Sequence, residues 1–130
     1  MAENAPRPSI LVVDDESLVR SMAVDMFEEA GFHVLEASSG EKALSLIQSC
    51  DGLAALFTDV ELGNSIDGIY LARVVHGEHP GAAIMVVSGQ HVARNGELPR
   101  GARFLAKPYD PDAVTKTLHA MLASDGGKRG

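Results

Sequence analysis

Leu53-Ala54-Ala55-Leu56-Phe57-Thr58-Asp59 is an apolar run that ends at a carboxylate. No polar residue alternates through it, which is typical of a strand buried on both faces of a parallel sheet. Ile10-Leu11-Val12-Val13-Asp14-Asp15 has the same form. Open α/β folds place their ligands at the carboxyl ends of the strands. The two stretches therefore predict that Asp14, Asp15 and Asp59 gather at one edge of a sheet.

Further strands and helices alternate along the rest of the chain. Apolar runs predict strands at 32–37, 82–88 and 102–106. Apolar residues at helical spacing predict helices at 16–30, 38–47, 67–77 and from 110 onward. Ser38 and Glu41 have capping-box spacing, and Asp110 precedes Pro111 as a cap precedes a first turn. The first helix is expected to bury one apolar stripe, made of Leu18, Val19, Met22, Ala23, Met26, Phe27 and Ala30.

This alternation predicts an α/β fold with a doubly wound, five-stranded parallel sheet. Because the strands are apolar throughout, helices should cover both faces of that sheet. The segment between the last two strands is the exception. Gln90–Glu97 offers only Val92 and Ala93 to a core, and the turn signal Asn95-Gly96 follows. The fourth helix of the fold is therefore expected to be short or irregular.

Composition narrows the class of protein. At 130 residues, with 45 % hydrophobic and 22 % charged residues, the chain is expected to form one domain over 8–123, between a disordered arm at 1–7 and a disordered tail at 124–130. The net charge of −7 argues against nucleic-acid binding. No apolar run is long enough to cross a membrane, and no signal peptide is evident. One cysteine, Cys50, is consistent with a cytoplasmic location.

Three crowded carboxylates define a chemistry. Two unit charges about 4 Å apart repel by roughly 4 kcal/mol at an effective dielectric constant near 20, so such a site takes up protons or a cation. Mg²⁺ suits oxygen ligands of this kind. A carboxylate beside the cation, here Asp59, is then placed to attack phosphorus. Ser88 and Lys107, which follow the fourth and fifth predicted strands, supply the hydroxyl and the cation that a phosphoryl group requires.

Taken together, these residues resemble the receiver domain of two-component response regulators over about residues 8–123. The resemblance rests on motifs in chain order: Val12-Val13-Asp14-Asp15-Glu16, Phe57-Thr58-Asp59, Asp67-Gly68, Val87-Ser88-Gly89 and Lys107-Pro108-Tyr109. It implies the flavodoxin-like strand order 2-1-3-4-5. In this family the corresponding Lys–Pro peptide bond is often cis, so the resemblance implies a cis bond at Lys107–Pro108.

The resemblance implies a role for each acid. Asp59 would accept a phosphoryl group from a phosphohistidine of a histidine kinase or a histidine phosphotransfer protein. Asp15 would bind Mg²⁺ (or Mn²⁺) directly and Asp14 through water. Asp59 and the backbone carbonyl of Glu61 would complete the protein's ligands to the metal.

Other positions would respond to the phosphoryl group. Ser88 would hydrogen-bond to it and Lys107 would form an ion pair with it, while Phe104 would rotate inward as Ser88 moves. Glu61 and Gln90, two positions beyond the acceptor and the serine, would tune the rate of hydrolysis.

Two departures from the family are evident. The proline usual four residues after the acceptor is replaced by Gly63, followed by a longer loop. Seven residues follow Ala123, too few for an output domain, so the chain is expected to act as a single-domain regulator without a DNA-binding domain. It would switch the binding of an unknown downstream protein or act as a phosphate sink.

Two alternatives remain open from the sequence. An aspartyl-nucleophile phosphohydrolase also uses a carboxylate after a buried strand, but it requires a second aspartate where this chain has Glu16, and a lid insertion that is not present. A pseudo-receiver would bind partners without phosphorylation, although the site residues are all present. The resemblance to receiver domains, which we favour, predicts a phosphoacceptor rather than an enzyme.

Overall fold

The computed structural model describes residues 7–63, 66–90 and 96–129, with side chains to residue 123. Its strands are β1 (Ser9–Val13), β2 (His33–Ala37), β3 (Ala55–Asp59), β4 (Ala83–Ser88) and β5 (Arg103–Ala106). Its helices are α1 (Ser17–Glu29), α2 (Gly40–Ser49), α3 (Gly68–Glu78) and α4 (Pro111–Arg129). The disordered arm predicted at 1–7 lies almost wholly outside the described residues.

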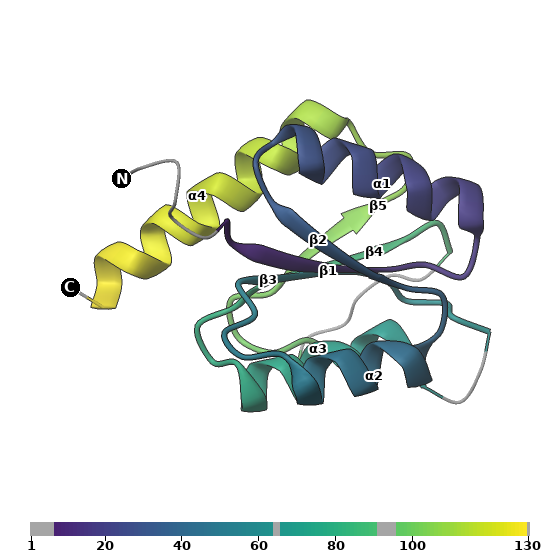
Figure 1. The fold of residues 1–130 in the computed structure, drawn as a ribbon, viewed down its shortest axis with the longest axis horizontal. Coiled ribbons are helices and arrows are strands. Elements are labelled where there is room, and N and C mark those ends of the chain that lie inside the picture. The colour runs from purple at the N-terminus through teal and green to yellow at the C-terminus, as the bar shows by residue number, and fades with distance from the viewer. Residues whose placement is uncertain (1–6, 64–65, 91–95, 130) are drawn as a thin grey trace.

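All strands pair in parallel in one sheet of order β2-β1-β3-β4-β5. In Figure 1, α1 and α4 cover one face of the sheet and α2 and α3 cover the other. This confirms the doubly wound fold and the strand order. It follows that β1 and β3 lie side by side in the interior of the sheet, with β4 next and β5 at an edge.

Two apolar clusters, one on each face, enclose the central strands. Leu11, Leu56 and Val86 belong to the cluster under α2 and α3, and Val12 and Phe57 to the one under α1 and α4. Every residue of β3 and β4 is buried, whereas β5 is half-buried to exposed. The continuous apolar runs of the sequence are explained by this double burial.

Polar side chains cap the starts of α2 and α3, whereas α1 begins without a side-chain cap. The Asp67 carboxylate accepts a hydrogen bond from the Tyr70 amide at 2.9 Å and so caps α3. For α2 the prediction was one residue off: the cap is Ser39, which accepts from the Lys42 amide at 3.1 Å, and not Ser38. Both serines suit the position by type, and only the backbone path into the helix decides between them.

The predicted apolar stripe of α1 was too wide. Ala23 and Phe27 are buried, but the side chains of Leu18 and Met22 are 74 % and 64 % exposed. Positions 18 and 22 lie on the flank of a helix whose positions 23 and 27 face the sheet, so the sheet cannot cover both pairs.

Predictions were made for two segments near the C-terminus: an irregular fourth helix between β4 and β5, and a disordered tail at 124–130. Between β4 and β5, no helix is assigned in the parts that the structure describes, 89–90 and 96–102, while 91–95 lie outside them. The tail predicted at 124–130 is corrected, because α4 continues to Arg129. Gly126 and Gly127 disfavour a helix by composition. However, adding residues to a helix that has already formed is far easier than starting one.

Candidate functional site

The acids predicted to meet do meet. Asp14 follows β1 and Asp59 ends β3, and since these strands are neighbours, Asp14, Asp15 and Asp59 place one carboxylate oxygen each within 4.8 Å of one another. Asp14 and Asp59 are buried, with 5 % and 6 % of their surface exposed, whereas Asp15 faces solvent. The site therefore combines buried negative charge with an open side.

Lys107 supplies the only cation whose ion pairs reach this cluster in the described chain. Its Nζ lies 3.2 Å from Asp59 Oδ2 and 3.7 Å from Asp14 Oδ2. The Lys107 amide donates to the Ser88 carbonyl at 2.9 Å, which fixes the start of the Lys107–Pro108 segment beside β4. That peptide bond is cis.

The electrostatics of the pair follow from burial. Burial raises the pKa of Asp59, and the hydrogen bond from Lys107 opposes this only in part. Burial alone would lower the pKa of Lys107, but the hydrogen bond and the charges of Asp59 and Asp14 outweigh it and raise that pKa. One cation is thus shared between two buried carboxylates, and the cluster as a whole carries excess negative charge.

One oxygen in this cluster has no hydrogen-bond partner among the described residues: the buried Asp59 Oδ1. A buried carboxylate oxygen without a partner is costly unless a proton or a cation satisfies it. Three carboxylates within 4.8 Å, all with hard oxygen donors, fit a divalent cation such as Mg²⁺. The residues present therefore fit the metal that the sequence predicted.

Ser88 faces the same site from β4. Its hydroxyl donates to the Glu61 carboxylate, with Oγ 2.9 Å from both carboxylate oxygens, and accepts from the Gln90 amide at 3.1 Å. Glu61 also adds to the negative charge that acts on Asp59. The two positions predicted to tune the site, Glu61 and Gln90, thus both contact the serine hydroxyl.

Comparison with known proteins places this geometry in a family. The model of the response regulator receiver domain matches residues 10–119. The chain belongs to this family. The three aspartates, the serine and the lysine therefore lie together within a receiver domain of two-component signalling.

Relatives agree with that placement. The chain is 32 % identical to the response regulator receiver protein CpdR of Brucella abortus, with 87 % of this chain and 95 % of CpdR covered. It is also 32 % identical to the sensor kinase CckA of the same organism, over 88 % of this chain but 12 % of CckA. A solved receiver protein from Sinorhizobium medicae has a TM-score of 0.84 at 28 % identity, covering 92 % of this chain and 97 % of that one.

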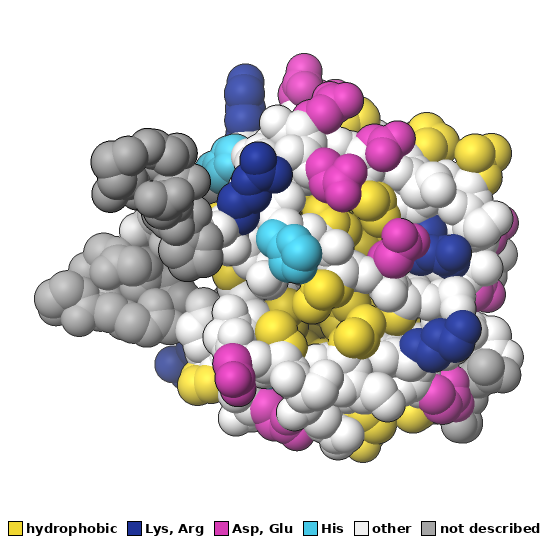
Figure 2. Space-filling view, in the orientation of Figure 1, with side chains coloured by type: hydrophobic (Ala, Val, Ile, Leu, Met, Phe, Trp, Pro, Cys, Tyr) yellow, Lys and Arg dark blue, Asp and Glu magenta, His cyan; other side chains and the backbone are white. Residues whose placement is uncertain are grey.

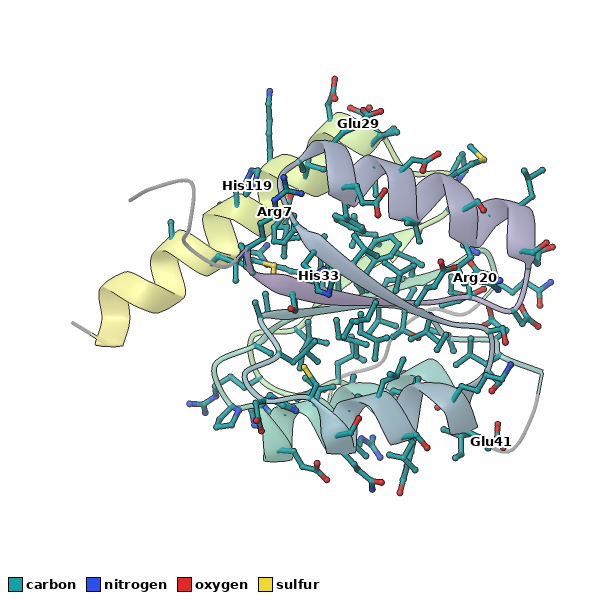
Figure 3. All side chains as sticks on the ribbon, viewed as in Figure 1. Arg7, Arg20, Glu29, His33, Glu41 and His119 are labelled. Atoms are coloured by element: carbon teal, nitrogen blue, oxygen red, sulfur yellow. The ribbon has the colours of Figure 1, made fainter. Side chains whose placement is uncertain are left out.

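The receiver positions its acids with residues that the sequence did not single out. Arg20 of α1 donates to the Asp14 carbonyl at 2.9 Å, and its Nε lies 2.9 Å from a Glu36 carboxylate oxygen. Figure 3 labels Arg20 beside the ends of β1 and β2. Neither partner is near in sequence, so no local pattern indicates this contact.

Gly68, which belongs to the predicted Asp67-Gly68 motif, also positions an acid of the site. A Cβ at this position would collide with the carbonyl oxygen of Asp59, and the Gly68 amide donates to the Val60 carbonyl at 2.9 Å. The start of α3 therefore packs directly on the backbone of Asp59. The Asp67-Gly68 motif was the available signal, although its reason is a close approach that appears only in three dimensions.

Phe104 is half-buried in β5 and packs against the cluster under α2 and α3. His79, which follows α3, uses both ring nitrogens within the fold. Its Nδ1 accepts from the Leu53 amide at 3.3 Å, and its Nε2 donates to the Ile47 carbonyl at 2.9 Å.

No helix in the described chain is long and apolar enough to span a membrane.

Proposed function

We propose that Asp59 of this receiver accepts a phosphoryl group from a phosphohistidine, presented by a histidine kinase or a histidine phosphotransfer protein. The observation that carries the proposal is the buried Asp59 carboxylate, with Oδ2 on Lys107 and Oδ1 unpartnered at the open carboxyl end of the sheet. The resemblance to the receiver protein CpdR supports a stand-alone receiver, because this chain covers 95 % of CpdR. The single cysteine supports the proposed cytoplasmic location.

In the proposed step, an Asp59 carboxylate oxygen forms a bond to phosphorus while the phosphorus–nitrogen bond of the donor breaks. The electron pair of that bond stays on the imidazole nitrogen. Lys107, 3.2 Å from Asp59 Oδ2, is placed to pair with the phosphoryl oxygens, and Ser88 is placed to donate to one of them. Both act by stabilising the negative charge that spreads over these oxygens.

Asp14, Asp15 and Asp59, with the backbone carbonyl of Glu61, would hold Mg²⁺ or Mn²⁺ at this site. The bound ion supplies positive charge that offsets the repulsion between the carboxylates and the incoming phosphoryl group. The charge of Lys107 alone is divided between Asp59 and Asp14, which explains why the protein needs a further cation.

Phosphorylation would be transmitted through Ser88 and Phe104. The Ser88 hydroxyl already donates to Glu61, so a phosphoryl group must displace that carboxylate to gain the hydrogen bond. Phe104 pairs in register with Val86, two residues before Ser88 on β4. Movement of Ser88 would let Phe104 rotate inward and change the surface offered to a downstream protein. Glu61 and Gln90 would set how readily water reaches the phosphoryl group.

The test is incubation of the purified protein with Mg²⁺ and acetyl phosphate, followed by intact mass measurement. We expect an adduct of one phosphoryl group that is absent without Mg²⁺ and absent in Asp59→Asn. Asp25→Asn, which changes an exposed acid of α1, serves as the matched control and should leave the adduct unchanged. No adduct in the unaltered protein would favour a phosphorylation-independent binding module, and steady release of phosphate from stable esters would favour a hydrolase.

A further inference from the structure

A cavity of about 530 Å³ opens at the amino ends of β4 and β5, opposite the acid site. Its inner wall includes the buried Ala83 and Ile84 of β4, and the half-buried Met121 of α4 closes one side. Pockets that bind small ligands have volumes of about 300–1,000 Å³ and mainly apolar walls. The cavity is therefore large enough for a small molecule, and its lining is suited to one with an apolar part.

The polar side chains of this cavity carry one sign of charge. Arg100, Arg103 and His76 line it, and none of the lining side chains in the described chain is acidic. This is unusual for a protein of net charge −7. The acids are instead found elsewhere, as Figure 2 shows for the surface over α1.

The two arginines are held at the cavity by a turn. The Ala102 amide donates to the Pro99 carbonyl at 3.1 Å, and Gly101 has φ of +85°. Arg100 and Arg103 therefore leave the chain on either side of one tight bend. Both are exposed, and neither forms an ion pair or a hydrogen bond within the described part of the chain. Their donors are available to a ligand.

We infer that this cavity is a binding site for a small molecule that carries a diphosphate group. Guanidinium groups bind phosphate oxygens in a bidentate manner, and two of them at one bend match two adjacent phosphates. His76 adds a further nitrogen on the opposite wall. The apolar inner wall accommodates the organic part of the ligand.

An acidic peptide is the other anionic occupant to consider. A peptide would bind along an extended groove or along the exposed edge of β5, whereas Arg100 and Arg103 line a cavity at the amino end of that strand. The cavity is also distinct from the acid site. It lies at the amino ends of β4 and β5, while Ser88 and Lys107 lie at or beyond the carboxyl ends of the same strands. Binding here does not require a functional Asp59.

The experiment is a titration of the ¹⁵N-labelled full chain, followed by amide chemical shifts in the presence of a chelator. The probes are inorganic pyrophosphate and adenosine diphosphate, with a hexaglutamate peptide as the competing class. We expect saturable shifts at Ala82–Ile84, Gly101–Arg103 and Met121. Tighter binding of adenosine diphosphate would show that the nucleoside occupies the apolar wall, and equal binding would show that the diphosphate alone is bound.

Variants make the result specific. Arg100→Gln and Arg103→Gln should each weaken binding about tenfold, since each removes charge-assisted hydrogen bonds, and the double variant should weaken it further. Lys116→Gln, which removes an exposed cation of α4 outside the cavity, is the matched control and should bind as the unaltered protein does. Asp59→Asn should also bind normally, which separates this site from the proposed phosphorylation.

Three outcomes would overturn the inference. The first is an absence of saturable shifts with both diphosphates, and the second is equal binding in the double variant and the unaltered protein. The third is tighter binding of hexaglutamate than of either diphosphate. The arginines are exposed, so their replacement leaves the core intact, and the single variants provide the answer if the double variant is poorly folded.

Discussion

The two ends of the sheet differ in charge and in what holds them together. At the carboxyl end, buried Asp14 and Asp59 share Lys107 and leave one oxygen unpartnered. At the amino end, Arg100 and Arg103 surround a cavity and the ring of His79 joins α2 to the segment before β3. Helices cover both faces of the sheet, so polar side chains reach solvent mainly where strands end. The fold therefore has two separate polar sites: an acidic one at the carboxyl end of the sheet and a basic one at the amino end.

The largest expected effect breaks the carboxyl end. Gly68→Ala places a Cβ against the Asp59 carbonyl. The clash can be relieved only if the backbone of Asp59 or the start of α3 shifts. We expect a loss of about 3 kcal/mol or more in the free energy of unfolding, measured by urea denaturation.

Gly77→Ala is the control in the same helix, because its added Cβ would meet nothing within 4 Å. It should be neutral or should stabilise the protein by about 0.5–1 kcal/mol through helix propensity. Similar losses in both variants would mean that the contact at Asp59 is not what requires glycine.

The next effect breaks the amino end alone. His79→Ala removes the partners of the Leu53 amide and the Ile47 carbonyl. Two hydrogen bonds in a part-buried place are lost, and we expect the free energy of unfolding to fall by about 1–3 kcal/mol. His76→Ala, at an exposed position of the same helix, should change it by about 0.5 kcal/mol or less. A change in Mg²⁺ affinity in the His79 variant would show that the two ends are not independent.

A third prediction concerns the pH dependence of the acid site. Because the pKa of Asp59 is raised in the folded state by burial, ionising this group destabilises the fold. The unfavourable contribution is absent below the ordinary value of 3.8, develops as the pH rises from that value to the folded pKa, and is complete above the folded pKa. With a chelator present, Asp59→Asn should therefore be more stable than the unaltered protein at neutral pH.

This advantage should shrink as the pH falls towards that ordinary value, as measured by urea unfolding at several pH values. Saturating Mg²⁺ should stabilise the unaltered protein more than the variant, by about 2.7 kcal/mol at a concentration one hundred times Kd if only the unaltered site binds. A variant less stable than the unaltered protein under chelator would show that the Lys107 interaction outweighs the burial of Asp59.

The smallest expected effect concerns Glu61, whose carboxylate accepts the Ser88 hydrogen bond. Glu61→Ala removes this acceptor of the Ser88 hydroxyl and a negative charge near Asp59, so phosphorylation by acetyl phosphate should be a few-fold faster. The phosphoryl lifetime should also change, and phosphorylation should not be abolished. Glu61→Gln keeps an acceptor for Ser88 and isolates the charge effect. Unchanged uptake and decay in both variants would remove Glu61 from the mechanism.

The sequence predicted the features that depend on strands buried on both faces. An apolar run followed by an acid is visible in one dimension, and so the edge of the sheet and the cluster of Asp14, Asp15 and Asp59 were anticipated. Lys107 was placed correctly beside Asp59 for the same reason. The strand order followed from the resemblance to receiver domains.

Features that depend on what a residue packs against were not predictable in this way. The exposure of Leu18 and Met22 depends on how α1 lies on the sheet, and the contacts of Arg20 and His79 join segments far apart in the sequence. The cavity at Arg100 and Arg103 forms from loops and helix ends that share no local pattern.

The position of each strand in the sheet also decides which half of the acid site is able to move. Asp14 follows β1 and Asp59 ends β3, and each of these strands is hydrogen-bonded to a neighbour on both sides. Lys107 follows β5, which pairs with β4 alone. Shifting the lysine disturbs one row of backbone hydrogen bonds, whereas shifting either of these acids disturbs two. We therefore expect the acids to be the fixed half of the site, and any movement that follows a change of charge there to occur at the outer strand.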